Sequence, residues 1–171
     1  MNEFKFLKPT KMIHPNNGMT LEFLNKQDAI AALIISNDGK KGYFVSQFRP
    51  GTNNISTEVV AGLIDPGEIP KDALYREVEE ESGFYKEDYE IIFQDDKPLA
   101  ISPGYTTEKL NLYILKIKDN NIKQKPLNLD EDEELVGEWL DLNLALSKSS
   151  DFKTYYLIRI YELLRLKNDE A

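Results

Sequence analysis

The sequence predicts an α/β (α+β) fold in which helices pack against a mixed β-sheet. Its 171 residues are enough for one domain, residues 1–171, and 41% of them are apolar, which allows a hydrophobic core. Strand-like segments come before and after one short helical segment, and a second helical segment ends the sequence. This order of strands and helices predicts the layered fold.

The first 27 residues predict an N-terminal β-strand extension. Residues 3–9 and 19–25 alternate between apolar and polar side chains, as half-buried strands do, and HPNNG between them indicates a turn. We therefore separate residues 1–27, as N-terminal strands, from residues 28–171, as the core.

The core begins with the apolar run AIAALIIS at 29–36, which is typical of a buried strand. The turn NDGKKG leads to a return strand at 43–48, and a further strand is expected at 56–62, before a helix. Beyond that helix, the pattern predicts strands at 88–94, 97–104 and 109–117, a strand that becomes helical within 137–146, and an amphipathic helix at 151–166.

The first helix is expected at 71–82, KDALYREVEEES, and its charges are unusually placed. Pro70 suits the first turn of this helix and Gly83 suits its C-cap. At about 100° per residue, Glu77 and Glu81 fall on the same side as the apolar residues that should face the core. Two carboxylates are therefore expected on the inner edge of the helix.

Two interpretations of these carboxylates are open. A solvated acidic face is the usual meaning of a charge run, and it suits Glu79, which points away from the core. It does not suit Glu77 and Glu81, because buried carboxylates must be paired or bind metal, and Arg76 alone cannot neutralise three of them. Mg²⁺ binds one or two carboxylates together with substrate phosphates. The spacing therefore favours a metal site over a salt-bridged surface helix.

Composition argues against several classes of protein and partner. A net charge of −9 disfavours general nucleic-acid binding, because nothing neutralises phosphates broadly. There is no cysteine for a disulfide or thiolate site, and one histidine, His14, is too few for a zinc site with several imidazoles. No apolar stretch approaches the roughly 20 residues of a membrane span, and the N-terminus lacks a signal-peptide pattern. We expect a cytoplasmic protein with neither a nucleic-acid nor a membrane partner.

The segment from Gly62 to Phe84, GLIDPGEIPKDALYREVEEESGF, resembles the Nudix box. The resemblance implies a Nudix-type αβα sandwich around a mixed sheet. It also implies hydrolysis of a nucleoside diphosphate linked to another moiety, with Mg²⁺ or Mn²⁺ as cofactor. Every defining position of the box is filled, namely Gly62, Glu68, Arg76-Glu77-Val78, Glu80-Glu81 and Gly83-Phe84.

The same resemblance implies roles for individual residues. Arg76 and Glu80 are implied to be catalytic, and Arg76 can hold a neighbouring carboxylate, for which Glu68 is the candidate. Structural roles within the box fall to Gly62, Glu68 and Gly83. The implied metal ligands are Glu77, Glu80, Glu81 and the backbone carbonyl of Ala61.

Two further stretches resemble ADP-ribose pyrophosphatases and related nucleoside-diphosphate-sugar hydrolases. The first, SQFRPGTNNISTEVVAGLID at 46–65, carries Arg49 and Glu58, which in such enzymes help to hold the nucleotide; each also suits an ordinary position on a strand. The second, ISPGYTTEKL, is otherwise an ordinary turn between strands. Its implied substrate-binding residues are Ser102, Gly104 and Glu108.

The acidic stretch LDEDEELVGEWLDL resembles a loop that, in the same enzymes, supplies a base for the attacking water. The best register makes Glu131 the base and Glu133 a residue close to the metal. The register is open within residues 130–134, and a solvated acidic loop is the alternative. A loop suits a group that must close over substrate.

The sequence thus predicts a metal-dependent pyrophosphohydrolase that cleaves ADP-ribose to AMP and ribose 5-phosphate, or acts on a similar nucleoside diphosphate sugar. Alternatives are GDP-mannose, a dinucleotide polyphosphate or NADH as substrate, and a sensor that binds ADP-ribose without cleaving it. The resemblance also implies a homodimer, with residues 19–25 as a candidate for exchange between subunits. Phe4 and Phe6 then stack on adenine across the dimer, or else pack into the core.

Overall fold

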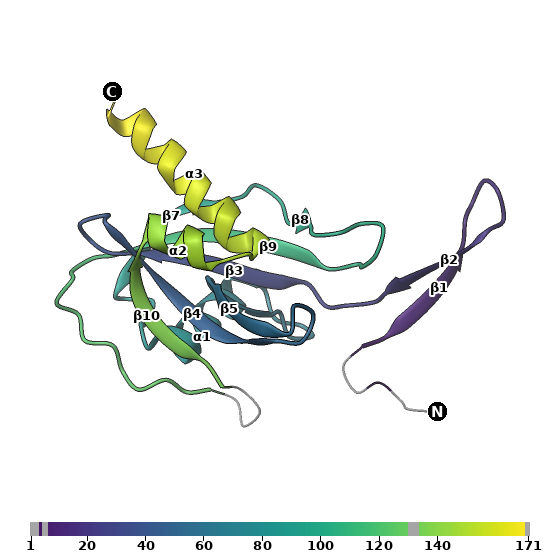
Figure 1. The fold of residues 1–171 in the computed structure, drawn as a ribbon, viewed down its shortest axis with the longest axis horizontal. Coiled ribbons are helices and arrows are strands. Elements are labelled where there is room, and N and C mark those ends of the chain that lie inside the picture. Colours follow the sequence, from purple (N-terminus) through teal and green to yellow (C-terminus); the bar gives the residue numbers. More distant parts are fainter. Residues whose placement is uncertain (1–3, 5–6, 130–133, 170–171) are drawn as a thin grey trace.

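The structure is a computed structural model that describes residues 4, 7–129 and 134–169. In this part of the chain an eight-stranded mixed sheet has the strand order β10-β4-β3-β9-β7, while β5 pairs with β4, β6 with β3 and β8 with β9 (Figure 1). β3 is parallel to β9, and the other pairings are antiparallel. The strands are β3 Ala29–Ile35, β4 Lys41–Arg49, β5 Asn54–Glu58, β6 Val60–Leu63, β7 Tyr89–Gln94, β8 Leu99–Ala100, β9 Lys109–Ile117 and β10 Val136–Asp141.

Helices cover both faces of this sheet, as expected for an αβα sandwich. On one face, α2 (Leu142–Lys148) and α3 (Phe152–Asp169) pack against alternate residues of β3 that begin with Ala29. On the other face, α1 (Pro70–Ser82) packs against the alternate set that begins with Ile30. Because both faces of β3 are buried, its sequence is a continuous apolar run. None of the described helices is both long and apolar enough to cross a membrane.

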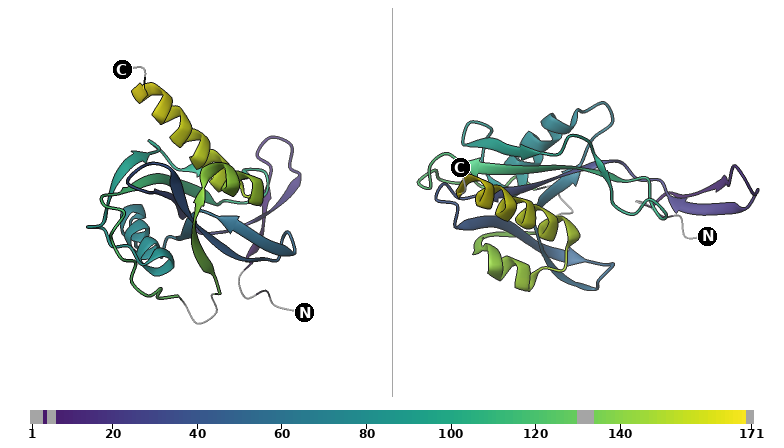
Figure 2. Two further views of the ribbon diagram at one scale, coloured as in Figure 1. Left: turned by 60° about the vertical axis from the view of Figure 1, so that its left-hand side comes forward. Right: turned by 90° about the horizontal axis from the view of Figure 1, so that it is seen from above.

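The N-terminal extension is a hairpin of β1 (Pro9–Ile13) and β2 (Thr20–Leu24), which projects away from the sandwich in both figures (Figures 1 and 2). The prediction of a strand at 3–9 was wrong for residues 4, 7 and 8, because β1 begins only at Pro9. Pairing stops at Pro9 and Leu24, since Leu24 turns to the main body, where its backbone amide donates to the carbonyl of Tyr105 (2.8 Å).

Two other predicted strands are shorter or interrupted. The strand expected at 56–62 is broken at Val59, whose amide donates to the hydroxyl of Thr154 on α3 (3.0 Å) instead of to a neighbouring strand. The strand expected at 97–104 is limited to β8, because Ser102 starts a turn in which its carbonyl accepts from the amide of Tyr105 (2.9 Å).

Candidate active site

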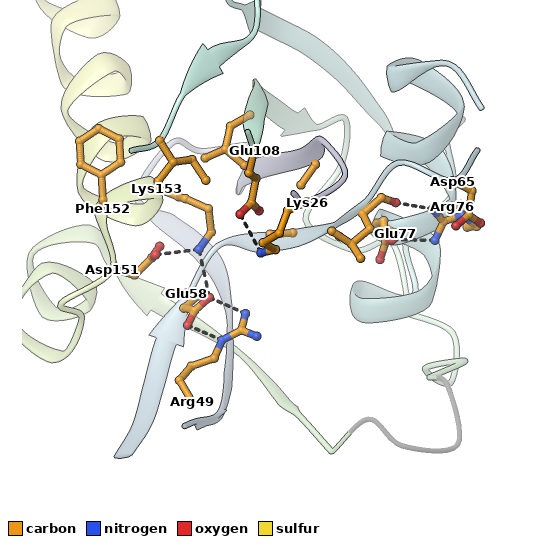
Figure 3. Close-up of a pocket in the computed structure, with 16 residues that line it drawn as sticks. Lys26, Arg49, Glu58, Asp65, Arg76, Glu77, Glu108, Asp151, Phe152 and Lys153 are labelled. Carbon is orange, nitrogen blue, oxygen red and sulfur yellow. Dashed lines mark hydrogen bonds and ion pairs between the residues drawn. The ribbon is translucent and has the colours of Figure 1, made fainter. Parts of the chain in front are cut away.

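A cavity of about 590 Å³ lies beside α1 and the first turn of α3 (Figure 3). Its walls come from β3 to β6, α1, β9, α3 and the segments next to them. Charged residues of both signs, far apart in the sequence, meet here. They are Lys26, Arg49, Glu58, Asp65, Arg76, Glu77, Glu108, Asp151 and Lys153.

Helix α1 presents carboxylates to this region because its two ends are fixed by Pro70 and Gly83 and because its buried face carries glutamates. Pro70 occupies the first turn, and Gly83 ends the helix in the left-handed conformation (φ 68°) with its amide donating to the carbonyl of Glu79. Glu77 is 8% exposed and Glu81 is 2% exposed, so both lie on the buried side of the helix, as the helical spacing predicts.

Arg76 holds three carboxylates together, and we call Glu68, Arg76, Glu77 and Glu80 the Arg76 cluster. The guanidinium donates to both oxygens of Glu68 (3.2 and 3.0 Å), to Glu77 (2.6 Å) and to Glu80 (3.2 Å). It also donates to the carbonyl of Leu63 on β6 (2.9 Å). The hydrogen bond with Glu68 is the main reason that the pKa of Arg76 is raised, and the same bond lowers the pKa of Glu68. The predicted Arg76–Glu68 contact is therefore present.

Strand β6 brings backbone oxygen atoms to the same corner. The amide of Ala61 donates to Oε2 of Glu81 (3.1 Å) instead of to β3. In an antiparallel strand the N–H and C=O groups of one residue point to the same side, so the Ala61 carbonyl also faces away from β3. Next to it, a Cβ atom on Gly62 would overlap the Glu77 carboxylate. Only glycine allows β6 to pass so close to that group.

The donor set at this corner fits a hard divalent cation in its chemistry. The carboxylates of Glu77, Glu80 and Glu81 and the carbonyl of Ala61 are all oxygen donors, which Mg²⁺ prefers. As they stand, no three acidic or histidine side chains among the described residues form a group that could hold a metal ion. One physical reason is that Arg76 Nη1 donates to both Glu77 and Glu80, so the guanidinium lies beside these carboxylates where a cation would bind.

A second group of charges lies across the cavity, and we call Arg49, Glu58, Asp151 and Lys153 the Lys153 cluster. Arg49 donates from Nε and Nη2 to the two oxygens of Glu58 (2.8 and 2.7 Å), and Lys153 Nζ donates to Glu58 (3.2 Å) and Asp151 (2.7 Å). Burial alone would raise the pKa of Glu58, but the hydrogen bonds from Arg49 and the charges of Lys153 and Arg49 lower it to about 2. Glu58 is therefore ionised although it is only 3% exposed.

A third pair connects the N-terminal extension to the cavity. Lys26 Nζ donates to Oε2 of Glu108 (2.7 Å), and the backbone amide of Lys26 donates to the hydroxyl of Thr107 (2.9 Å). The segment after the hairpin is thus hydrogen-bonded to the segment that leads into β9.

The structure brings most of the predicted site residues together. Seven line the cavity, and Glu80, Glu81 and Glu68 contact residues that do. Ser102 and Gly104 are not among the lining residues, since they belong to the adjacent turn, and Gly104 lines a separate groove beside the hairpin. Glu131 and Glu133 lie outside the described residues. The seven are Arg49, Glu58, Ala61, Gly62, Arg76, Glu77 and Glu108.

Sequence reasoning missed the residues that the ends of distant segments bring to the cavity. Asp151 accepts from the amide of Thr154 (2.9 Å) and thereby caps α3. An acidic residue at the start of a predicted helix is a recognisable N-cap signal, but it does not tell which strand that helix end meets. The missed lining residues with charged or aromatic side chains are Lys26, Asp65, Asp151, Phe152 and Lys153.

The fold and the site together define an αβα sandwich with a carboxylate-bearing helix beside a cavity that also contains fixed arginine and lysine side chains. Residues 25–159 match the family model described as the NUDIX domain. This covers most of the sequence, so the chain belongs to the Nudix family and is a Nudix hydrolase.

Several characterised proteins are similar to it. A methanol dehydrogenase activator of Bacillus methanolicus is 32% identical over 154 residues, covering 86% of this chain and 80% of the relative. An ADP-ribose pyrophosphatase of Bacillus subtilis is 29% identical over 147 residues, covering 83% and 76%. The ADP compounds hydrolase NudE of Escherichia coli is 31% identical over 91 residues, covering 53% and 45%. The chain thus resembles the ADP-ribose pyrophosphatase subfamily, as its motifs predict.

Proposed function

We propose that this Nudix hydrolase is a Mg²⁺- or Mn²⁺-dependent pyrophosphohydrolase that cleaves ADP-ribose to AMP and ribose 5-phosphate. The observation that carries the proposal is the pairing, across one cavity, of the α1 carboxylates with an arginine fixed by a buried glutamate. The first group suits a divalent cation and the second suits a diphosphate. The similarity to ADP-ribose pyrophosphatases supports the choice of substrate.

In the proposed reaction Glu77, Glu80, Glu81 and the Ala61 carbonyl hold the cation, which supplies charge neutralisation and an acidified water when bound. Arg76 keeps Glu77 and Glu80 in place. The remaining residues bind and orient the diphosphate, and most of the rate enhancement comes from this positioning and from charge stabilisation.

Further roles rest on the resemblance. Arg49 and Glu58 help to hold the nucleotide, and Glu108 contacts substrate at the side of the cavity near Lys26. Ser102 and Gly104 complete the site from the neighbouring turn. Glu131 is the proposed base and Glu133 the proposed residue near the metal.

The test is release of AMP from ADP-ribose by the purified protein with Mg²⁺, compared with GDP-mannose, NADH and diadenosine polyphosphates at equal concentration. We expect ADP-ribose to be the preferred substrate and EDTA to abolish the reaction. Preference for another compound would change the substrate and keep the chemistry. Binding of ADP-ribose without any hydrolysis would favour the sensor instead.

A second candidate follows from the similarity to the methanol dehydrogenase activator. The name of that relative describes a protein that activates a dehydrogenase. In this second candidate function, the chain increases the rate of a dehydrogenase. Adding the protein to a methanol dehydrogenase reaction, with and without ADP-ribose, tests this. A rate increase that ADP-ribose does not affect would favour the activator.

We further propose a homodimer in the cytoplasm. The hairpin leaves Met12 48% and Leu21 36% exposed, and both line the groove that Pro103 and Gly104 complete. Phe4 is 63% exposed, which agrees better with contact to a partner than with core packing, while Phe6 lies outside the described residues. Sedimentation equilibrium of the wild type and of Leu21→Glu tests the dimer, and a monomeric wild type would contradict it.

A further inference from the structure

The first turn of α3 reaches into the cavity although it lies about ninety residues after the strands that form the opposite wall. Thr154 is fully buried, and its hydroxyl accepts from the amide of Val59 at the break between β5 and β6. Asp151 caps the same turn by accepting from the amide and hydroxyl of Thr154 (2.9 and 2.8 Å). The turn is therefore fixed against the strand that carries Glu58.

Lys153 projects from this fixed turn onto Glu58. Figure 3 shows its ammonium group between the carboxylates of Asp151 and Glu58, with Arg49 approaching Glu58 from the other side. The Lys153 side chain is 18% exposed and that of Glu58 is 4% exposed. Partly buried ion pairs of this kind, at 3.2 Å to Glu58 and 2.7 Å to Asp151, restrict the side chains that form them.

Glu58 passes this restriction to Arg49. Its two oxygens bind the Nε and Nη2 atoms of Arg49, which fixes the plane of the guanidinium. The opposite edge of the group, with Nη1, then points away from Glu58, and the Arg49 side chain remains 40% exposed. Arg49 thus has one edge held by the protein and one edge available to a ligand in the cavity.

We propose that Lys153 is a positioning residue for substrate binding: by fixing Glu58, it aims the free edge of Arg49 at the diphosphate. This inference rests on the proposed function, since it requires an anionic diphosphate in the cavity. Asp151 contributes by holding Lys153, and the cap it forms sets the place of both residues.

The charge of the Lys153 cluster leads to the same conclusion. Its two cations balance its two carboxylates, so the cluster presents no net charge to an anionic substrate. Removing the Lys153 ammonium group would leave one negative charge in excess beside the diphosphate. Substrate binding should then weaken through both misorientation of Arg49 and repulsion.

The experiment compares Lys153→Met with Lys153→Arg, which keeps the charge and can still bond to Glu58. Lys148→Met is the matched control, because Lys148 is an exposed lysine of α2 whose nearest ion-pair partner is Glu138 (3.5 Å). For Lys153→Met we expect KM for ADP-ribose to rise about five- to tenfold, with kcat within about twofold of the wild type. Lys153→Arg and Lys148→Met should both keep a KM close to that of the wild type.

The readouts separate this inference from the proposed function. Wild-type hydrolysis of ADP-ribose tests the function, and the ratio of variant to wild-type KM tests the role of Lys153. The dissociation constant of ADP-ribose, measured by calorimetry with Ca²⁺ in place of Mg²⁺, should rise by the same factor and does not depend on turnover. An unchanged KM and dissociation constant, with only a lower melting temperature, would overturn the inference and leave Lys153 a purely structural residue.

Discussion

The Arg76 cluster and the Lys153 cluster border the same cavity but differ in charge balance. In the first, one guanidinium contacts three carboxylates, so these four side chains carry two more negative than positive charges. In the second, two cations face two carboxylates. Because the charges of the Lys153 cluster cancel, it needs no further ion to hold its side chains in place. The excess negative charge of the Arg76 cluster instead suits the binding of a divalent cation. The difference suggests which side of the cavity performs chemistry and which side holds the substrate.

Of the variants that test this difference, Glu81→Gln is expected to have the largest effect, a loss of kcat; Glu81 lies next to the Arg76 cluster. Glutamine keeps an oxygen that can accept from Ala61, so the fold should be preserved while the charge is lost. We expect kcat for ADP-ribose with Mg²⁺ to fall by about a hundredfold to a thousandfold. Glu79→Gln is the control, since Glu79 is exposed on the other face of α1. Near-normal activity in Glu81→Gln would contradict the metal assignment.

The next effect is expected from Gly62→Ala, which adds a methyl group where the Glu77 carboxylate lies. Because the obstacle is the end of a flexible side chain, the carboxylate should move and the strand should stay. We expect kcat to fall between about tenfold and a hundredfold through misplacement of one ligand. Steady-state kinetics and thermal unfolding would be measured beside Gly51→Ala, where a Cβ meets nothing within 4 Å. Equal losses in both variants would mean that the Glu77 position is unimportant.

These two predictions concern residues that the sequence alone could identify. The helical spacing placed Glu77 and Glu81 on the buried side of α1, and the continuous apolar run at 29–36 indicated a strand that is buried on both faces. Such local patterns predict the fold because the direction of a side chain repeats every 3.6 residues in a helix and every two residues in a strand, which fixes the residues that can be buried.

The Lys153 cluster could be predicted only in part, because the sequence pointed to Arg49 and Glu58 but gave no sign that Asp151 and Lys153 join them. Lys153 and Glu58 are 95 residues apart, and they meet only because the amide of Val59 binds Thr154 at the break between two strands. The break is the single residue Val59, and nothing in the sequence STEVVAG at 56–62 marks it. The start of β1 was missed for a related reason, because it depends on where Leu24 leaves the hairpin.

A smaller effect, on stability instead of turnover, is expected from Glu58. Its pKa is about 2 in the folded protein against 4.5 as the reference value, so its stabilising contribution is complete above pH 4.5 and is lost as the pH falls toward 2. Between pH 7 and pH 3 the difference in unfolding free energy between the wild type and Glu58→Gln should shrink by about 2 kcal/mol. Urea unfolding at both pH values measures this. A difference that stays constant would show that the Arg49–Glu58 pair does not depress this pKa.

The smallest effect is expected where an ion pair is exposed and lies far from both clusters. Lys11 and Glu22 face each other across the hairpin at 2.9 Å, and each side chain is 71% exposed. Solvent weakens such a pair, so Glu22→Gln should change the unfolding free energy by less than about 0.5 kcal/mol. KM for ADP-ribose should also stay unchanged, since the pair is not part of the cavity.

A raised KM would instead mean that the hairpin reaches a cavity in another subunit, which is what exchange between protomers requires. The KM for ADP-ribose of the Glu22→Gln variant therefore tests whether a second chain completes the site, in the same assay that compares the variants of the two clusters.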